Sequence, residues 1–136
     1  MATIEEGIKG RLTAFAGLTA LISTRTFEGG IPQGETLPCV TFNRISTPRI
    51  HTHDTSGSTG LAHPRFQIDA WATTYASAKA IADQVRAALN GYKGTITVGA
   101  STVKIQAALV EDERVNHEPG TALKSLSSDY IIWHEE

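Results

Sequence analysis

Alternation of apolar and polar side chains with a period of two residues is the feature that most constrains the fold of this chain. Four stretches show it: 39–45, 63–72, 102–110 and 123–134. In the second of them, Phe66 and Ile68 alternate with Arg65 and Gln67. This spacing sends successive side chains to opposite faces of a strand. We therefore expect four strands of a sheet that has one buried face.

In each stretch, one set of alternate side chains is mainly apolar, and we expect this set to form the buried face of the sheet. In chain order they are Val40, Phe42, Phe66, Ile68, Ala70, Ala72, Val103, Ile105, Ala107, Leu109, Leu126, Ser128, Tyr130 and Ile132. A further short strand at 95–98 is expected to form a hairpin with 102–110 through a turn at 99–101. The polar segment 111–114 that follows is expected to end the strand.

Two principal helices are indicated by periodicity closer to 3.6 residues. The first begins at Thr3, where Glu6 completes a capping box, and is expected to end at Gly17, with another short helical turn after it. The second begins at Thr73 or Thr74 and ends at Asn90-Gly91. Its expected buried side chains are Ala78, Ile81, Val85, Ala88 and Leu89. Residues 29–38 are too rich in glycine and proline for regular structure and form a connector.

The length of the chain predicts one domain. With 136 residues, 40% of them hydrophobic, it falls within the roughly 100 to 200 residues usual for a single domain. We expect residues 1–136 to adopt an α+β fold, in which a mixed, mainly antiparallel sheet packs against the two principal helices.

Residues 47–62 depart from the rest of the chain in composition. They are mostly Thr, Ser, Gly, His and Asp, with almost no large apolar side chain. Such a segment cannot bury enough apolar surface to offset the entropy lost on ordering. We therefore expect a mobile polar loop here, and loops of this length inside a compact domain are usually functional or disordered.

Charge and cysteine content exclude several classes of protein. The net charge is −2, which lacks the basic excess of nucleic-acid-binding proteins. The single cysteine, Cys39, cannot form an internal disulfide. No segment matches a signal peptide or the ~20 apolar residues of a membrane span. We therefore expect neither a nucleic acid nor a membrane as partner.

Charge is divided unequally along the chain. Residues 1–110 hold ten basic and seven acidic side chains, whereas residues 111–136 hold two basic and seven acidic ones, giving +3 and −5. Opposite patches of this kind suit contacts between copies of one chain. Two alternatives stay open: either set could face another partner, and the acidic residues could simply solvate strand ends. The candidate interaction residues are Arg44, Arg49 and Arg65 on one side and Glu111, Asp112, Glu113 and Glu118 on the other.

No catalytic or cofactor motif is recognisable. The glycine-rich segment 29–34 does not open a helix as a phosphate-binding loop must, and 56–60 does not match the nucleophile elbow of hydrolases. His51, His53, Asp54 and His63 have a spacing that suits a metal site. Solvated loop residues are the preferred interpretation, because metal ligands need a rigid support. We expect no enzymatic activity, no cofactor and no metal.

Three blocks of sequence together resemble a known family. They are 37–46, then 65–72 followed by Tyr75 and an alanine-rich helix, and finally 111–114 with a closing strand that ends in Trp133. Their order and spacing are similar to those of the tail-completion, or tail-terminator, proteins of long non-contractile-tailed bacteriophages and prophages. The resemblance covers nearly the whole chain, although the loop at 47–62 is not fixed by the family pattern.

The resemblance implies a structural virion protein without an active site. Such a protein is made in the host cytoplasm and then caps the finished tail tube as a homohexameric ring at the head-proximal end of the tail. Its implied partners are further copies of itself, the tail-tube protein, and the head connector or stopper protein. Two alternatives stay open: another neck component such as a connector adaptor, and a small enzyme or metal-binding protein that uses the 51–63 histidines.

Overall fold

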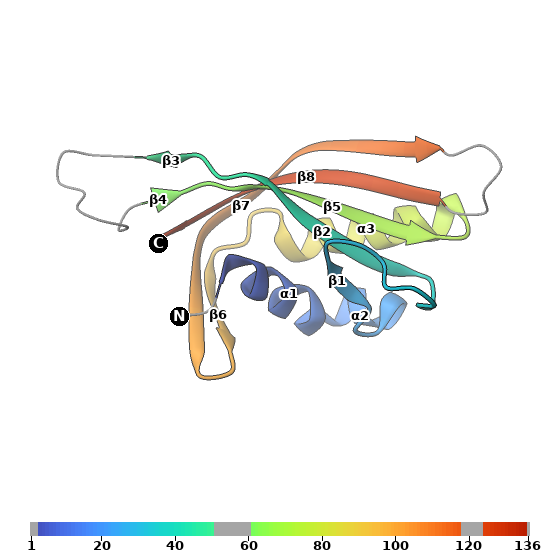
Figure 1. Cartoon of the computed structure of the whole chain (residues 1–136), viewed down its shortest axis with the longest axis horizontal. Coiled ribbons are helices and arrows are strands. Elements are labelled where there is room, and N and C mark those ends of the chain that lie inside the picture. Colours follow the sequence, from blue (N-terminus) through green and yellow to red (C-terminus); the bar gives the residue numbers. More distant parts are fainter. Residues whose placement is uncertain (1–2, 51–60, 118–123, 136) are drawn as a thin grey trace.

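The computed structural model describes residues 3–50, 61–117 and 124–135 (Figure 1). Within them it contains helices and strands that confirm the α+β fold. The helices are α1 (Ile4–Ala14), α2 (Ala16–Ile22) and α3 (Tyr75–Leu89). The strands are β1 (Thr26–Glu28), β2 (Cys39–Ser46), β3 (Arg49–Ile50), β4 (Leu61–Ala62), β5 (Arg65–Ala72), β6 (Gly94–Val98), β7 (Ser101–His117) and β8 (Lys124–Glu135).

All eight strands belong to one sheet, and β8 is its centre. One edge of β8 pairs with β7, and the other pairs with β5 and, further along, with β4. Beyond β5 lies β2, then the short β1, while β6 pairs with the first part of β7. Every pairing except β1 with β2 is antiparallel. The mixed, mainly antiparallel sheet is therefore confirmed.

Two prolines interrupt the sheet where strands would otherwise run on. Pro48 separates β2 from β3, and Pro64 separates β4 from β5. Proline has no N–H to donate to a ladder, so strands break or bend there. The carbonyls of both prolines still accept hydrogen bonds from backbone N–H groups, Pro48 from His63 and Pro64 from Ile132, each at 3.0 Å. The strand pairs β2–β5 and β3–β4 thus continue one another across the interruptions.

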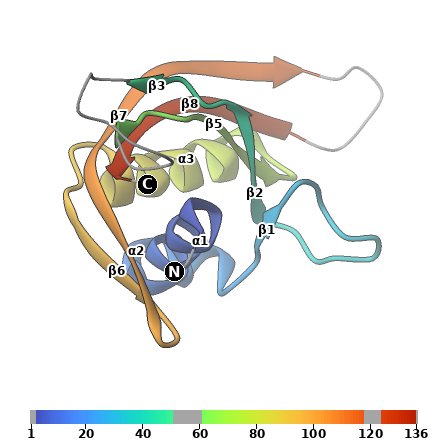
Figure 2. The same ribbon diagram turned by 60° about the vertical axis from the view of Figure 1, so that its left-hand side comes forward.

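One face of the sheet curls over the helices, as Figure 2 shows. The largest fully buried side chains come from this inner face and from the helices that cover it: Tyr130, Phe42, Phe66, Ile8, Leu12, Leu18, Ile22, Ile68, Ile81, Leu89, Ile105 and Ile132. The core therefore lies between the inner face and the three helices. None of the helices in the described residues is long and apolar enough to cross a membrane.

Helix α1 begins as the sequence predicts and ends earlier. The Thr3 side chain accepts a hydrogen bond from the Glu6 N–H at 3.2 Å, and the Glu6 carboxylate accepts one from the Thr3 N–H at 3.1 Å. The expected end at Gly17 is wrong, because the backbone turns at Phe15 and Gly17 lies within α2. At Gly7 the helix lies close to β7, since a Cβ there would lie 3.1 Å from the Cβ of Val103.

Helix α3 matches the sequence prediction at both ends. The Thr74 side chain accepts a hydrogen bond from the Ser77 N–H at 3.2 Å. After the last turn, Gly91 adopts a positive φ of 79°, which glycine tolerates without a Cβ clash. The five side chains expected to be buried are at most 1% exposed.

The inward set predicted for 102–110 is half wrong. Val103 and Ile105 are buried, but Ala108 is buried instead of Ala107, and Leu109 is 48% exposed. The reason is a shift of register between Ile105 and Ala107, where two residues of β7 advance against one of β8. A bulge of this kind moves every later side chain to the other face.

Three further differences concern strand boundaries. Strand β7 continues through 111–114, which the sequence predicts as the end of a strand, because β8 pairs with it as far as His117. Strand β1 and the pair β3–β4 were not predicted, since two or three residues carry no measurable alternation. The pair β3–β4 occupies both ends of the segment 47–62, and residues 51–60 lie outside the described residues.

The packing of α3 predicts the effect of a charge in the core. Replacing Ile81, which is 1% exposed, by Asp should lower the free energy of unfolding by about 3 kcal/mol or more, because an unpaired carboxylate would be buried. The measurement is urea denaturation followed by circular dichroism. Ala80→Asp, at an exposed position on the same helix, is the matched control and should change stability by less than about 1 kcal/mol. Equal effects of the two variants would contradict the assignment of the buried face.

Candidate functional site

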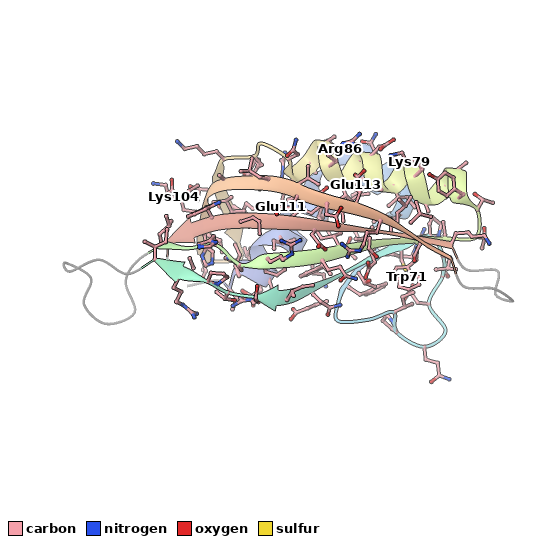
Figure 3. The ribbon with its side chains drawn as sticks, turned by 90° about the horizontal axis from the view of Figure 1, so that it is seen from above. Trp71, Lys79, Arg86, Lys104, Glu111 and Glu113 are labelled. Atoms are coloured by element: carbon pink, nitrogen blue, oxygen red, sulfur yellow. The ribbon has the colours of Figure 1, made fainter. Side chains whose placement is uncertain are left out.

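The outer face of the sheet turns away from the helices and is seen from above in Figure 3. Its side chains come from the alternate positions of β2, β5, β7 and β8. Two carboxylates on this face are nearly inaccessible: Asp69 is 7% exposed and Asp129 is 5% exposed. Buried carboxylates are rare unless they are paired, so their partners identify the interactions that hold this face together.

Asp129 on β8 binds two arginines. Arg65 of β5 donates to its Oδ2 at 2.7 Å, and Arg114 of β7 donates to Oδ2 at 3.0 Å and to Oδ1 at 3.1 Å. Arg114 also pairs with Asp112 at 2.8 Å, and Arg65 with Glu111 at 3.4 Å. The network therefore joins three adjacent strands across the centre of the sheet.

The ion pairs of the network shift the pKa values of Asp129 and of the two arginines. The hydrogen bonds from Arg114 are the main cause that holds the pKa of the Asp129 carboxyl below its usual range, and Arg65 adds to the effect against the opposing influence of burial. The same pairing raises the pKa of both guanidinium groups. Asp129 is consequently a structural anion and not a proton donor at neutral pH.

Asp69 lies at the centre of a second, smaller set of hydrogen bonds. It accepts from the Ser127 hydroxyl and from the Gln67 amide, the latter at 3.1 Å. Beside it, the Trp71 indole N–H donates to the Thr41 hydroxyl at 2.9 Å. No helix covers this face in the described residues, so these hydrogen bonds between neighbouring side chains satisfy its buried polar groups.

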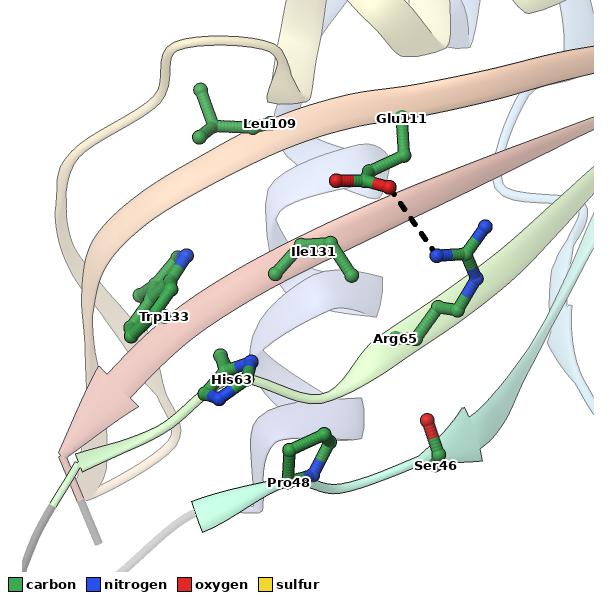
Figure 4. A pocket seen from close by; sticks show the side chains of 8 residues that line it. All are labelled: Ser46, Pro48, His63, Arg65, Leu109, Glu111, Ile131 and Trp133. Carbon is green, nitrogen blue, oxygen red and sulfur yellow. Dashed lines mark hydrogen bonds and ion pairs between the residues drawn. The ribbon is translucent and has the colours of Figure 1, made fainter. Parts of the chain in front are cut away.

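A shallow groove of about 460 Å³ opens on the outer face near β3 and β4 (Figure 4). Apolar and aromatic side chains form most of it, and the Arg65–Glu111 ion pair closes one end. The lining residues are Ser46, Pro48, His63, Arg65, Leu109, Glu111, Ile131 and Trp133. The ring of His63 stacks on that of Trp133, with centroids 4.3 Å apart and planes 19° from parallel. The groove presents an apolar contact surface with charges at its rim.

The basic candidates predicted from the sequence lie on two parts of the sheet. Arg44, near the end of β2, forms an ion pair with Glu5 of α1, and Arg49 lies on β3. Arg65 lies in the middle of the sheet, where it pairs with acidic groups of its own chain.

The acidic candidates lie together on β7 but face different neighbours. Glu111 and Asp112 belong to the outer face through Arg65 and Arg114. Glu113 lies between β7 and α3 in Figure 3, with its Oε1 3.6 Å from Nη1 of Arg86. Burial and, after it, the Glu113 carboxylate raise the pKa of the Tyr130 hydroxyl. Glu118 lies outside the described residues.

Of the residues considered for a metal site, only His63 can be placed. It is on the groove and stacks on Trp133, whereas His51, His53 and Asp54 lie outside the described residues. Within residues 3–50, 61–117 and 124–135, no group of three or more His, Cys, Asp or Glu side chains could hold a metal ion.

Sequence reasoning missed Asp129 and Arg114 as the centre of the outer face. The alternation does assign Asp129 and Arg65 to outward positions. Alternation gives no register, however, and the register of β7 depends on a bulge near Glu111. The available signal was the outward carboxylate of Asp129 together with the outward Arg65, whereas Arg114 lies in the segment 111–114 that the sequence predicts as the end of a strand.

Residues 6–135 match the family model of tail completion protein gp17, so the chain belongs to this family. It is accordingly a structural protein of a phage tail. No curated protein matches its sequence.

The fold has a counterpart among solved structures. A chain from the structure described as "Virion of native gene transfer agent (GTA) particle" superposes with a TM-score of 0.68 at 16% sequence identity. The match covers 98% of the present chain and 95% of the other. At this identity the likeness shows a shared fold.

The Asp129 network predicts an acid-sensitive part of the stability. Because the folded-state pKa of Asp129 is lowered, its contribution is fully present above the unfolded-state pKa of about 4 and is lost as the pH falls through the folded value. Asp129→Asn should reduce stability at pH 7 by about 2 kcal/mol, with part of the charge interaction screened by solvent around the two half-exposed arginines. Urea denaturation between pH 7 and pH 3 tests this: the difference between the two proteins should shrink towards pH 3. A constant difference would contradict the assignment.

Proposed function

We propose that the protein caps the finished tail tube as a homohexameric ring and forms the surface to which the head connector docks. Membership of the tail completion family over residues 6–135 carries this proposal. The ring would form in the host cytoplasm and remain at the head-proximal end of the tail in the virion. The partners would be further copies of the chain, the tail-tube protein, and the connector or stopper protein.

The distribution of charge supports a head-to-tail contact between copies. Arg44 and Arg49 lie on β2 and β3, and Glu111, Asp112 and Glu113 lie on β7, on the other side of β8. In a ring, one patch of each subunit meets a different patch of the next subunit, so opposite charges on the two sides favour closure. Arg65 stays a candidate beside them; like Arg44, which pairs with Glu5, it also pairs within its own chain, with Glu111.

Imaging of the protein with tail tubes tests the proposal directly. Purified protein mixed with tubes of the same phage should produce an added ring at one end of each tube in negative stain, and capped tubes should then bind isolated head connectors. A control with tubes that are already capped should show no further binding. Binding to connectors without any binding to tubes would support a connector adaptor instead and would overturn the proposal.

The charge arrangement predicts a reciprocal pair of variants. Glu111→Lys, Asp112→Lys and Glu113→Lys together should strongly reduce ring formation on tubes, and adding Arg44→Glu and Arg49→Glu should restore it. Each exposed ion pair contributes only about 0.2 to 1 kcal/mol, so the loss should be greatest at low salt. The acidic residues also pair within the chain, and the thermal stability of each free variant is the necessary control. Normal capping by the first variant at low salt would eliminate the charge pairing.

A further inference from the structure

The outer edge of β7 is paired over only part of its length. Strand β6 covers it from Ser101 to Ile105. Further along, the segment that follows α3 forms hydrogen bonds with this edge. The Gly91 N–H donates to the Ala108 carbonyl at 2.6 Å, and the Asn90 side chain accepts from the Val110 N–H at 3.1 Å. From 111 to 117, no strand in the described part of the chain pairs with this edge, although β8 pairs with the other edge throughout.

The direction of the backbone groups on this edge follows from the ladder. The Val110 N–H points away from β8, because it bonds to Asn90. Val110 faces the inner side opposite Tyr130, and Glu113 and Val115 face the same side opposite Ser128 and Leu126. In an antiparallel ladder, residues on one face direct their N–H and C=O groups to the same edge. Glu113 and Val115 therefore direct theirs outward, where a further strand could bind.

The chain carries a second open edge on the opposite side of the sheet. Strand β1 covers β2 only from Val40 to Phe42, and the Gly29 N–H closes that stretch by bonding to the Phe42 carbonyl at 2.9 Å. Residues 43–46 of β2 and the strand β3 are exposed, and no described strand lies beyond them. Arg44 follows Val40 and Phe42 in the alternation, so its backbone groups also point outward.

The two open edges are complementary in charge and different in sequence. Acidic residues 111–113 begin one edge, and Arg44 and Arg49 lie along the other. Pairing of two β7 edges would bring like charges together, which is unfavourable. Pairing of β7 with the β2–β3 edge of a second copy joins opposite charges and leaves each subunit with one edge free for the next copy.

The exposure of side chains near the open edge of β7 also supports a second copy of the chain as the partner. Val115 is 56% exposed although it faces the helix side of the sheet, and Tyr75 at the start of α3 is 52% exposed. Helix α3 extends beside this part of β7 in Figure 3, so an added strand would lie over the helix rather than in free solvent. Strand addition would cover Val115 and satisfy the outward backbone groups together.

We propose that neighbouring subunits join by strand addition, with residues 111–117 of β7 pairing with residues 43–46 and β3 of the next copy, so that the sheets run continuously around the assembly. This inference rests on the proposed function, because a head-to-tail strand contact needs a closed ring to stop it from extending into a fibre. It specifies the interface, which the family assignment does not.

Proline substitution tests the backbone contact. Val115→Pro removes one outward N–H without touching the ladder to β8, so the free protein should fold normally, whereas its association into rings on tubes should weaken by roughly tenfold or more. Val115→Thr keeps the N–H and a β-branched shape and should assemble as the unaltered protein does. The matched control is Thr97→Pro, which makes the same change on β6, an edge strand outside the interface.

The outcomes separate this inference from the proposed function. If the unaltered protein does not cap tubes, the proposed function fails and the interface fails with it. If the unaltered protein and Val115→Pro cap tubes equally well, the function stands and strand addition at β7 is wrong. If Thr97→Pro impairs capping as strongly as Val115→Pro, the loss reflects proline in any edge strand and the interface is likewise rejected.

Chemical crosslinking then identifies the partner edge. Protein carrying Val115→Cys is mixed with protein carrying Arg44→Cys, since both side chains face the helix side of the sheet, assembled on tubes and treated with a short bismaleimide; Cys39 is fully buried and does not compete. We expect crosslinked dimers in the mixture and none with Val115→Cys alone. Dimers from Val115→Cys alone would show pairing between two β7 strands, and capped tubes without any crosslink would place the interface elsewhere; either result overturns the proposal.

Discussion

The central position of β8 is the constraint on which the rest of the structure depends. Strands β5 and β7 pair with its two edges, so β8 is flanked on both sides. Its successive side chains point alternately into the core and to the outer face. Tyr130 and Ile132 are fully buried against the helices, whereas Asp129 binds Arg65 and Arg114 on the other side. Both the apolar core and the outer salt-bridge network are therefore anchored in the same strand, and a change of register there would disrupt both.

The absence of helices on the outer side, among the described residues, explains how the polar groups of the outer face are satisfied. Three helices cover the inner face, and their apolar stripes supply the hydrophobic driving force. The outer face has no covering layer in the described residues, so its buried carboxylates are satisfied by side chains that lie along the sheet itself. The outer face thus presents an apolar groove with the charged pair of Arg65 and Glu111 at its rim.

Bulges and prolines shape the sheet and thereby its edges. The shift of register near Gln106 turns Leu109 outward into the groove, and the shift near Glu111 places Glu111 and Asp112 on the outer face while Glu113 contacts Arg86 of α3. Pro48 and Pro64 interrupt the strand pairs, but their carbonyls accept backbone hydrogen bonds that keep the strands on either side in line. The shifts of register decide which charged side chains of β7 face α3 and which lie on the outer face.

The sequence by itself determined the longer helices and strands and which face of most strands is buried. The capping box at Thr3, the limits of α3 and the alternation in 39–45, 63–72 and 123–134 are all local signals, and the structure agrees with them. Only the tertiary structure decided the end of α1, the length and bulges of β7, and the short strands β1, β3 and β4. It also decided that Asp129 meets Arg65 and Arg114, since 64 residues separate Asp129 from Arg65 along the chain. The physical reason is that periodicity reports which way a side chain points, whereas register and long-range ion pairs depend on how separate strands align once the core has packed.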